Sequence, residues 1–327
     1  MVALFICSIA ISAGAQKHEK QKAKEARSDL SPVIWRDRGD IGGLNLIYGA
    51  GGKEHAPDPN AGYTFVKEDM SGTSPKFDVR DKQGVEWRVK LGAEPQSETA
   101  ATRFLWAAGY FVDEDYYLPL LKVTGVPRLR RGMDFVTEDG AVSGARLKRK
   151  GKNIKKIGNW DWFKNPFDGT RELNGLRVMM ALINNWDLKN VNNVVYQSDG
   201  EARYVVSDLG ASFGKTGNNI SRSKSNVEGY GKSKFIDKES NEEVDLEMHS
   251  RPFLPTVVNL PNYRMRTRIE DITKHIPRAD AKWVGQLLGQ LSEQQIRDAF
   301  RSAGYTAEEV EGYTTEMRKR IAELNAL

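Results

Sequence analysis

The 327-residue chain changes its pattern near the middle, and this change limits the folds that it can adopt. Residues 60–150 hold short β-type runs, among them TFVKED, KFDVRD and VEWRVKLG, which the turn segments SGTSP and KQG join. Such runs predict an antiparallel meander. Beyond this region, in residues 151–327, apolar residues instead recur at helical spacing, as in TRELNGLRVMMALINNW. We therefore expect an α+β fold in which a small, β-rich lobe precedes a mainly helical lobe.

Each lobe is expected to contain some structure of the other type. In the first lobe, SETAATRFLWAA has apolar residues at helical spacing, with Ser97 as the expected N-cap. Strands are expected to follow over YYLPLLKV and AVSGARLK. In the second lobe, VVY and YVV bracket a turn at SDG, and KFIDKESNEEVDLEM favours a further hairpin. Mostly helical sequence resumes near Asn262.

The N-terminal segment differs from both lobes. VALFICSIAISAGA has the length of a signal-peptide core, and Ala13-Gly14-Ala15 fits the small-x-small pattern of a cleavage site. No positive flank precedes this run, so a buried strand is the alternative. We expect a signal peptide over residues 1–15, with cleavage near Ala15 and export to the periplasm or the outside. Residues 16–59 are expected to form a charged tether and an irregular N-terminal extension.

The composition excludes several classes of site. The only cysteine, Cys7, lies in the predicted signal peptide, so a cleaved chain would have no thiol and no disulfide. The four histidines lack the spacing of metal ligands, which argues against a zinc site. Hydrophobic residues make up 39% of the chain and charged residues 28%, which is typical of a globular protein in water.

Polar side chains follow the long predicted helix in an order that suits phosphate chemistry. Asp187 can accept the proton of an acceptor hydroxyl, and Lys189 can neutralise charge on a transferred phosphoryl group. Asn192 comes five residues after Asp187, and the predicted hairpin returns Asp208 to the same place. A magnesium ion that bridges phosphates needs a carboxylate and a carbonyl oxygen at short range. Asn192 and Asp208 are therefore the predicted metal ligands.

The first lobe supplies groups that can bind the phosphates of a nucleotide. Lys90 ends the third predicted strand, where an ammonium group can reach the α- and β-phosphates of ATP. Glu98 lies eight residues further on, in the first turn of the next predicted helix, and can pair with Lys90. The turn Ser71-Gly72-Thr73-Ser74 can offer backbone N–H groups and hydroxyls as donors. These residues are the predicted cofactor-binding set.

Two short motifs carry a resemblance to a known superfamily. WDLKNVN is similar to the D-L-K-x-x-N catalytic loop of protein kinases, and DLG resembles their D-F-G magnesium motif with Leu in place of Phe. With the short phosphate turn and the helix ETAATRFLWAAGY, the chain resembles the atypical branch of the protein-kinase-like superfamily that includes HipA-type and phosphoinositide-type kinases. The resemblance covers roughly residues 60–215. It implies a bilobal protein-kinase-like fold and a phosphotransferase that uses ATP and Mg²⁺.

The chain also departs from the kinase pattern. No His-Arg pair precedes Asp187, no glycine triad covers the nucleotide, and no Ala-Pro-Glu closes the activation segment. Two alternatives on the same fold therefore stay open. One is a pseudokinase that binds a partner but is catalytically inactive, and the other is transfer of a nucleotidyl (AMP) group. The sequence does not name the acceptor, which can be a protein or a small molecule.

A serine hydrolase is a more remote alternative. GASFG fits the G-x-S-x-G elbow, with Ser212 as the nucleophile and His249 or His275 as the base. Such an elbow continues directly into a helix. The following KTGNNISRSKSN is rich in Gly, Asn and Ser, which disfavour a helix.

Two further segments carry concentrated basic charge. RLKRKGKNIKK, from Arg146 to Lys156, lies near the expected junction of the lobes and predicts contact with an anionic surface, with a solvated linker as the alternative. It lacks interleaved aromatic residues, so we expect no specific nucleic acid. Residues 215–233 occupy the place of an activation segment and have the composition of a mobile loop. Their Ser221, Ser223 and Ser225 are candidate self-modification sites.

Overall fold

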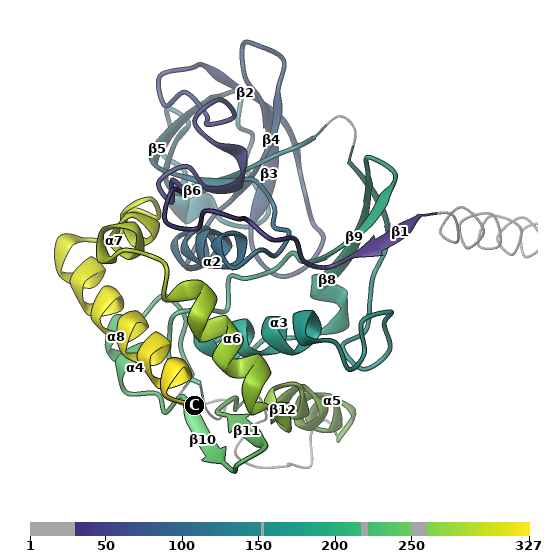
Figure 1. Cartoon of the computed structure of the whole chain (residues 1–327). Helices are drawn as coiled ribbons and strands as arrows, with labels where there is room; N and C mark the ends of the chain where they lie inside the picture. The colour runs from purple at the N-terminus through teal and green to yellow at the C-terminus, as the bar shows by residue number, and fades with distance from the viewer. Residues whose placement is uncertain (1–29, 152–153, 217–221, 250–259) are drawn as a thin grey trace, which may run out of the picture.

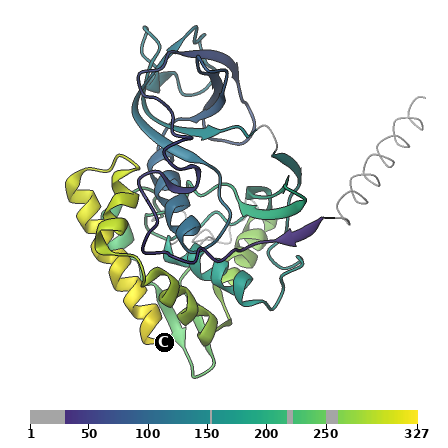
Figure 2. The same cartoon turned by 45° about the horizontal axis from the view of Figure 1, so that its top comes forward.

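The computed structural model describes residues 30–151, 154–216, 222–249 and 260–327 of the chain. Residues 1–29 lie outside this range, so the signal peptide, its cleavage near Ala15 and export stay predictions. Among the described residues, no helix is long and apolar enough to cross a membrane. Figures 1 and 2 show a small lobe of strands above a larger, mainly helical lobe. This arrangement confirms the expected two-lobed α+β architecture.

The small lobe is a closed β-barrel in which the strands follow the order β2-β3-β4-β6-β5. Its elements are β2 Tyr63–Glu68, β3 Lys76–Arg80, β4 Glu86–Lys90, β5 Asp115–Thr124, the 3-10 turn η2 Met133–Phe135, and β6 Ala141–Arg149. The predicted meander is confirmed over β2, β3 and β4, and β5 closes the barrel by pairing in parallel with β2. Val79, Val89 and Leu147 are fully buried inside, because alternate side chains of a strand point to the same face.

The helix of the small lobe, α2 (Pro95–Ala107), is held by both lobes. It begins at a proline, two residues before the Ser97 N-cap that the sequence predicts. That prediction is wrong because proline at a first helical position needs no partner for an N–H group. The Ser97 hydroxyl instead donates to the Gly210 carbonyl at 2.8 Å. Further along α2, the ring of Phe104 packs against Phe300, with centroids 5.2 Å apart.

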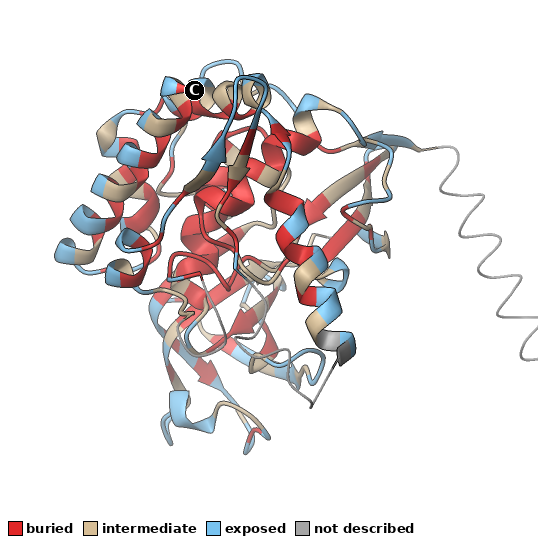
Figure 3. Ribbon diagram, turned by 90° about the horizontal axis from the view of Figure 1, so that it is seen from below, coloured by how far each residue is buried: buried red, intermediate tan, exposed pale blue. Residues whose placement is uncertain are grey.

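The large lobe consists of helices around two small sheets. Its helices are α3 Arg171–Leu182, α4 Val227–Gly231, α5 Leu260–Glu270, α6 Arg278–Leu288, α7 Glu293–Arg301 and α8 Ala307–Ala326, with 3-10 turns η3 Asn190–Asn192 and η4 Asp271–Thr273. Its strands are β7 Lys155–Gly158, β8 Asn193–Ser198, β9 Glu201–Val206, β10 Ile236–Glu239, β11 Glu243–Leu246 and β12 Ile276–Pro277. Both predicted hairpins, β8–β9 and β10–β11, are confirmed. Figure 3 shows that the helices turn buried faces inward and exposed faces outward.

The described part of the N-terminal extension is more regular than its sequence predicts. Strand β1 (Ser31–Val33) pairs in parallel with β9, and the 3-10 turn η1 (Gly49–Gly51) follows. Between these elements, Ile34, Ile41 and Leu46 are buried in the main hydrophobic core. Strand β1 is not predictable from its residues because three positions are too few for an alternating pattern to appear. Its pairing partner is also distant in the chain.

Candidate functional site

A cavity of about 550 Å³ lies where the barrel meets the large lobe. Its lining includes all the residues that the sequence predicts as catalytic, cofactor-binding or metal-binding: Ser71, Gly72, Thr73, Ser74, Lys90, Glu98, Asp187, Lys189, Asn192 and Asp208. These residues come from two lobes and from segments more than a hundred positions apart. The fold therefore brings the whole predicted set to one place, while the role of each residue stays a prediction.

Lys90 is the centre of the charged groups on the barrel side of the cavity. It ends β4, and its Nζ lies 2.8 Å from Glu98 Oε2 and 3.2 Å from Asp208 Oδ1. Burial by itself would lower the pKa of Lys90, but the charges of Glu98 and Asp208 outweigh it and raise that pKa above its usual range. Lys90 is therefore a permanent cation, and it links the barrel, α2 and the DLG segment.

Glu94 belongs to the same cluster, although the sequence analysis did not single it out. Its Oε2 lies 2.7 Å from Lys90 Nζ and accepts a hydrogen bond from Ser74 Oγ, also at 2.7 Å. Its Oε1 lies 2.6 Å from Lys224 Nζ. Burial raises the pKa of Glu94, but Lys90 and Lys224 more than reverse this and lower it to about 2. The i,i+4 spacing from Lys90 is the one sequence signal that pointed to it.

Glu94→Gln is expected to reduce stability at neutral pH, with a loss that shrinks in acid. The folded-state pKa of about 2 lies below the ordinary value of 4.5, so the stabilisation is present above pH 4.5 and is lost between pH 4.5 and 2. It amounts to roughly 3 kcal/mol at most. Denaturant unfolding of both proteins at several pH values measures this difference.

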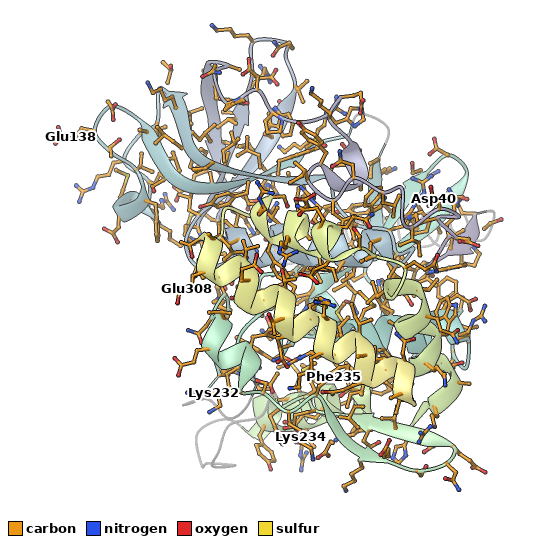
Figure 4. All side chains as sticks on the ribbon, turned by 60° about the vertical axis from the view of Figure 1, so that its left-hand side comes forward. Asp40, Glu138, Lys232, Lys234, Phe235 and Glu308 are labelled. Atoms are coloured by element: carbon orange, nitrogen blue, oxygen red, sulfur yellow. The ribbon has the colours of Figure 1, made fainter. Side chains whose placement is uncertain are left out.

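Glu138→Gln is the matched control for this experiment. Glu138 is exposed at the tip of a turn in the small lobe, and Figure 4 shows it pointing away from the body of the protein. Its replacement should leave the pH profile of stability unchanged. A Glu94→Gln deficit that stayed constant from pH 7 to pH 3 would contradict the proposed ion pairs.

Arg146 forms a second buried charge cluster behind Lys90. Its guanidinium lies 2.8 Å from Glu98 and 3.2 Å from Asp115, and all three side chains are almost fully buried. Burial raises the pKa of Glu98, but Arg146 and Lys90 lower it overall. Asp115 shares the same arginine, and burial raises its pKa above the usual range. Arg146 thus fixes Glu98 in the position from which it pairs with Lys90.

This cluster shows that part of the basic tract from Arg146 to Lys156 is engaged inside the protein, while contact of the tract with an anionic surface stays a prediction. Arg146 and Lys148 lie on β6 and are engaged by carboxylates, Lys148 with Asp113 at 2.8 Å. Arg146 and Lys148 are two residues apart on β6 and therefore point to the same face of the strand, where carboxylates neutralise them. These two charges line the candidate cavity.

Buried polar contacts fix the start of the loop that carries Asp187. Asn184, just after α3, has a positive φ of 54°, a backbone region that Asn tolerates better than most residues. The fully buried Arg320 of α8 donates to Asn184 Oδ1 at 2.7 Å and to the Leu182 carbonyl at 3.0 Å. Its guanidinium also lies over the ring of Phe235, which Figure 4 places beside α8. Helix α8 therefore holds the turn that leads to Asp187.

Asp187 has two charged or polar neighbours from its own loop. Lys189 Nζ lies 2.7 Å from its Oδ1, and Asn192 Nδ2 donates to its main-chain carbonyl at 2.7 Å. Arg266 of α5 is further away, with Nη1 at 4.0 Å from Oδ1. The side chain of Asp187 is about one-fifth exposed, so an acceptor can reach it from the cavity.

The oxygen atoms of Asn192 and Asp208 suit a magnesium ion. The amide nitrogen of Asn192 is used by Asp187, which leaves its Oδ1 as an acceptor. The described contacts of Asp208, with Lys90 and with the Gly210 N–H, use Oδ1, and the side chain is 43% exposed. No cluster of three or more His, Cys, Asp or Glu side chains in the described part of the chain can hold a metal ion. A magnesium ion here would therefore complete its coordination with water molecules and phosphate oxygens.

An arginine side chain binds the main chain of the turn between β2 and β3. Arg131 Nη1 donates to the carbonyls of Gly72 and Thr73 at 2.7 and 3.1 Å. The Ser71 N–H is already used by Asp69 Oδ1 at 2.8 Å. The turn therefore offers fewer free backbone donors than the sequence predicts.

The cavity is lined by more cationic side chains than carboxylates, although Arg88, Arg146 and Lys148 pair with aspartates behind the lining. Its cationic lining residues are Lys76, Arg88, Lys90, Arg146, Lys148, Lys156 and Lys189, against three carboxylates, Glu98, Asp187 and Asp208. Val191, Val194 and Tyr196 add an apolar part. An anionic ligand with a flat apolar group matches this distribution of charge and surface.

The geometry does not support a serine hydrolase at Ser212. This residue is fully buried, and its Oγ has no hydrogen-bond partner among the described residues. His275, one of the two bases considered, is exposed and pairs with Glu243. No helix directly follows the elbow; the first helix after Ser212 in the described chain is α4. A catalytic nucleophile needs both a nearby base and access for the substrate, and in the part of the chain that the structure describes Ser212 has neither. The match of GASFG to the elbow motif is therefore accidental.

The described part of the predicted activation segment is anchored rather than loose. Trp186 Nε1 donates to the Ser223 carbonyl at 2.9 Å, and the Ser225 N–H bonds to the Ser212 carbonyl at 2.9 Å. Helix α4 follows, and its Tyr230 is fully buried. The Gly, Asn and Ser content of the segment predicted a mobile loop, because composition does not indicate long-range hydrogen bonds. Ser221, one of the candidate self-modification sites, lies outside the described residues.

Comparison with known proteins gives structural neighbours only. No protein-family model and no curated protein sequence matches the chain. The proinflammatory kinase CtkA of Helicobacter pylori aligns with a TM-score of 0.47 and 11% identity, over 80% of this chain and 96% of that chain. The Golgi casein kinase aligns with a TM-score of 0.38 and 9% identity, over 89% of this chain and 76% of its own. Its form with Mn/ADP bound aligns with a TM-score of 0.39, at the same identity and coverage.

The chain's own geometry identifies its fold. A barrel strand ends in Lys90, the helix between the lobes supplies Glu98, and a hairpin separates the catalytic loop from the DLG segment. These elements follow one another in the order of an atypical protein-kinase-like fold.

Proposed function

We propose that this protein is a kinase-like phosphotransferase that uses ATP and magnesium. The observation that carries the proposal is the position of Lys90, whose Nζ contacts Glu98 at 2.8 Å and Asp208 at 3.2 Å. A single cation thus joins the phosphate-binding strand, the helix between the lobes and a predicted metal ligand. Asp187 and Asn192 line the same cavity.

The residues that line the cavity would have different roles in the transfer. Asn192 and Asp208 would hold the magnesium ion, which neutralises phosphate charge when it is bound. Lys90 would bind phosphate oxygens, and Lys189 would stabilise charge on the γ-phosphoryl group. Asp187 would accept the proton of the acceptor hydroxyl as that oxygen bonds to the γ-phosphorus. The bond between the γ-phosphorus and the β–γ bridging oxygen would break, and ADP would leave.

A thermal-shift experiment tests nucleotide binding directly. ATP with MgCl₂ is expected to raise the unfolding midpoint by several degrees, because ligand at about 100 times its Kd adds roughly 2.7 kcal/mol to stability. Lys90→Met should remove most of this rise. Lys122→Met, which alters an exposed lysine on β5, should keep it. An equal rise in all three proteins would contradict the assigned site.

Labelled ATP then separates the candidate reactions. Transfer of label from the γ-phosphate to protein or small-molecule acceptors supports phosphoryl transfer, whereas transfer from the α-phosphate identifies nucleotidyl transfer. ATP binding without transfer of either label, to any acceptor and with either Mg²⁺ or Mn²⁺, indicates a pseudokinase and overturns the proposal.

A further inference from the structure

A second cavity, of about 270 Å³, lies at the lobe junction and is distinct from the candidate nucleotide site. It is formed by the N-terminal extension, the end of α2, the connection to β5, and strands β8 and β9. Its most prominent feature is a group of four arginines, which we call the arginine pocket: Arg36, Arg38, Arg149 and Arg203. Arg36 and Arg203 have carboxylate partners, so Arg38 and Arg149 are the guanidinium groups that need an anion to balance them.

The carboxylates that line the arginine pocket are already used elsewhere. Asp113 pairs with Lys148 at 2.8 Å, and Glu114 lies 2.9 Å from His55 Nδ1. Burial raises the pKa of Asp113, but Lys148 lowers it overall, so this carboxylate is ionised and committed to the lysine. The lining acids therefore do not neutralise the arginines.

Two of the arginines are fixed in position by neighbours. Arg203 lies 3.0 Å from Glu201 through Nε and 2.8 Å from Asp199 through Nη2, and Arg36 also pairs with Glu201. Both guanidinium groups also lie over the ring of Phe111, at 5.4 Å for Arg36 and 5.3 Å for Arg203. These contacts hold two cationic groups at the wall of the pocket before any ligand arrives.

The other two arginines have no acidic partner among the described residues. Arg38 donates to the main-chain carbonyls of Trp106 and Tyr110, at 2.9 and 3.1 Å. Burial lowers its pKa, and the nearby Arg36 lowers it further. Arg149 forms no ion pair with any described residue, although it lines the same cavity. Partly buried cations without a counter-ion destabilise the protein, and a bound anion would reverse this cost.

We propose that the arginine pocket is a binding site for a small phosphorylated molecule. Guanidinium groups match phosphate oxygens through paired hydrogen bonds, which favours phosphate over a simple halide. The cavity is smaller than most ligand sites, so the ligand is a phosphate group with at most a small organic part. The site does not depend on the proposed reaction, because none of its arginines lines the candidate nucleotide cavity.

The arginine pocket is connected to the candidate nucleotide site. Tyr196 lines both cavities. Ser207, the residue before Asp208, donates a hydrogen bond from its Oγ to Asp113 at 3.0 Å. Lys148, the ion-pair partner of Asp113, lines the nucleotide cavity. The two cavities therefore share one lining residue and are linked by the Asp113–Ser207 contact beside the predicted metal ligand.

Titration with inorganic phosphate at constant ionic strength tests the site. Saturating phosphate, compared with chloride, is expected to raise the unfolding midpoint by about 3 °C at ten times its Kd. Arg149→Gln and Arg38→Gln should each abolish this rise. Arg149→Gln is the decisive variant, because Arg38 also binds the end of α2 and its loss affects folding.

Two controls separate this inference from the proposed function. Lys90→Met should keep the response to phosphate and lose the response to ATP with magnesium, whereas Arg149→Gln should do the reverse. Arg301→Gln, which alters an arginine that is 60% exposed, should keep both. A phosphate response that is absent, does not saturate, or is equal in the wild type and Arg149→Gln would overturn the arginine pocket as a binding site.

Discussion

Asp187→Asn is expected to lower phosphoryl transfer by about 10²-fold or more while ATP binding persists. Asparagine keeps the size of the side chain but cannot accept the proton of the acceptor hydroxyl. The variant alters the contacts of the Asp187 carboxylate with Asn192 and Lys189. The Asn192 hydrogen bond to the main-chain carbonyl of residue 187 does not involve the replaced group, so the loop should keep its shape. Transfer of label from γ-labelled ATP measures the rate, and the thermal shift with ATP and magnesium measures binding.

The control for this variant is Asp168→Asn. Asp168 is an exposed aspartate in the segment before α3 and does not line the candidate cavity. This change should leave both transfer and binding unchanged. Transfer at the wild-type rate by Asp187→Asn would show that another group takes the proton, and would remove Asp187 as the base.

Asp208→Ala is expected to abolish the magnesium-dependent part of nucleotide binding. The carboxylate is 43% exposed and contributes little to the core, so the protein should remain folded. Lys90 keeps Glu98 and Glu94 as partners, which holds it in the cavity. Midpoints of unfolding with ATP alone and with ATP plus magnesium, for both proteins, give the effect. The two midpoints should differ in the wild type and coincide in the variant.

The comparison requires a variant that removes a carboxylate elsewhere. Asp134→Ala alters an exposed aspartate in η2 and should respond to magnesium as the wild type does. A full magnesium response in Asp208→Ala would mean that the cation is held by other oxygens, and the assignment of Asp208 as a ligand would fail.

Short-range patterns in the sequence predicted residues that the fold brings to one cavity, while their roles stay predictions. Lys90 closes a strand and Glu98 lies in the first turn of the next helix, so their separation is set by local geometry. Asp187 and Asn192 share one loop, and a two-residue turn returns the chain to Asp208. Such relations depend on strand alternation, helical periodicity and turn chemistry, which neighbouring residues specify.

Long-range partners could not be predicted in this way. Arg146 looked like part of a basic surface tract, yet it is buried between Glu98 and Asp115. Arg320 lies far from Asn184 in the sequence but orders the start of the catalytic loop. The sequence around each of these two arginines does not indicate which distant residue it binds.

The sequence by itself determined the order of the two lobes and the residues that meet in the cavity, because local periodicity and turn residues fix each element. The tertiary structure decided which charges are buried and with whom they pair, as for Glu94, Arg146 and the arginine pocket. The physical reason is that the energy of a charge depends on its loss of water and on the distance to its counter-ion. Both quantities exist only after segments that are distant in the chain have packed together.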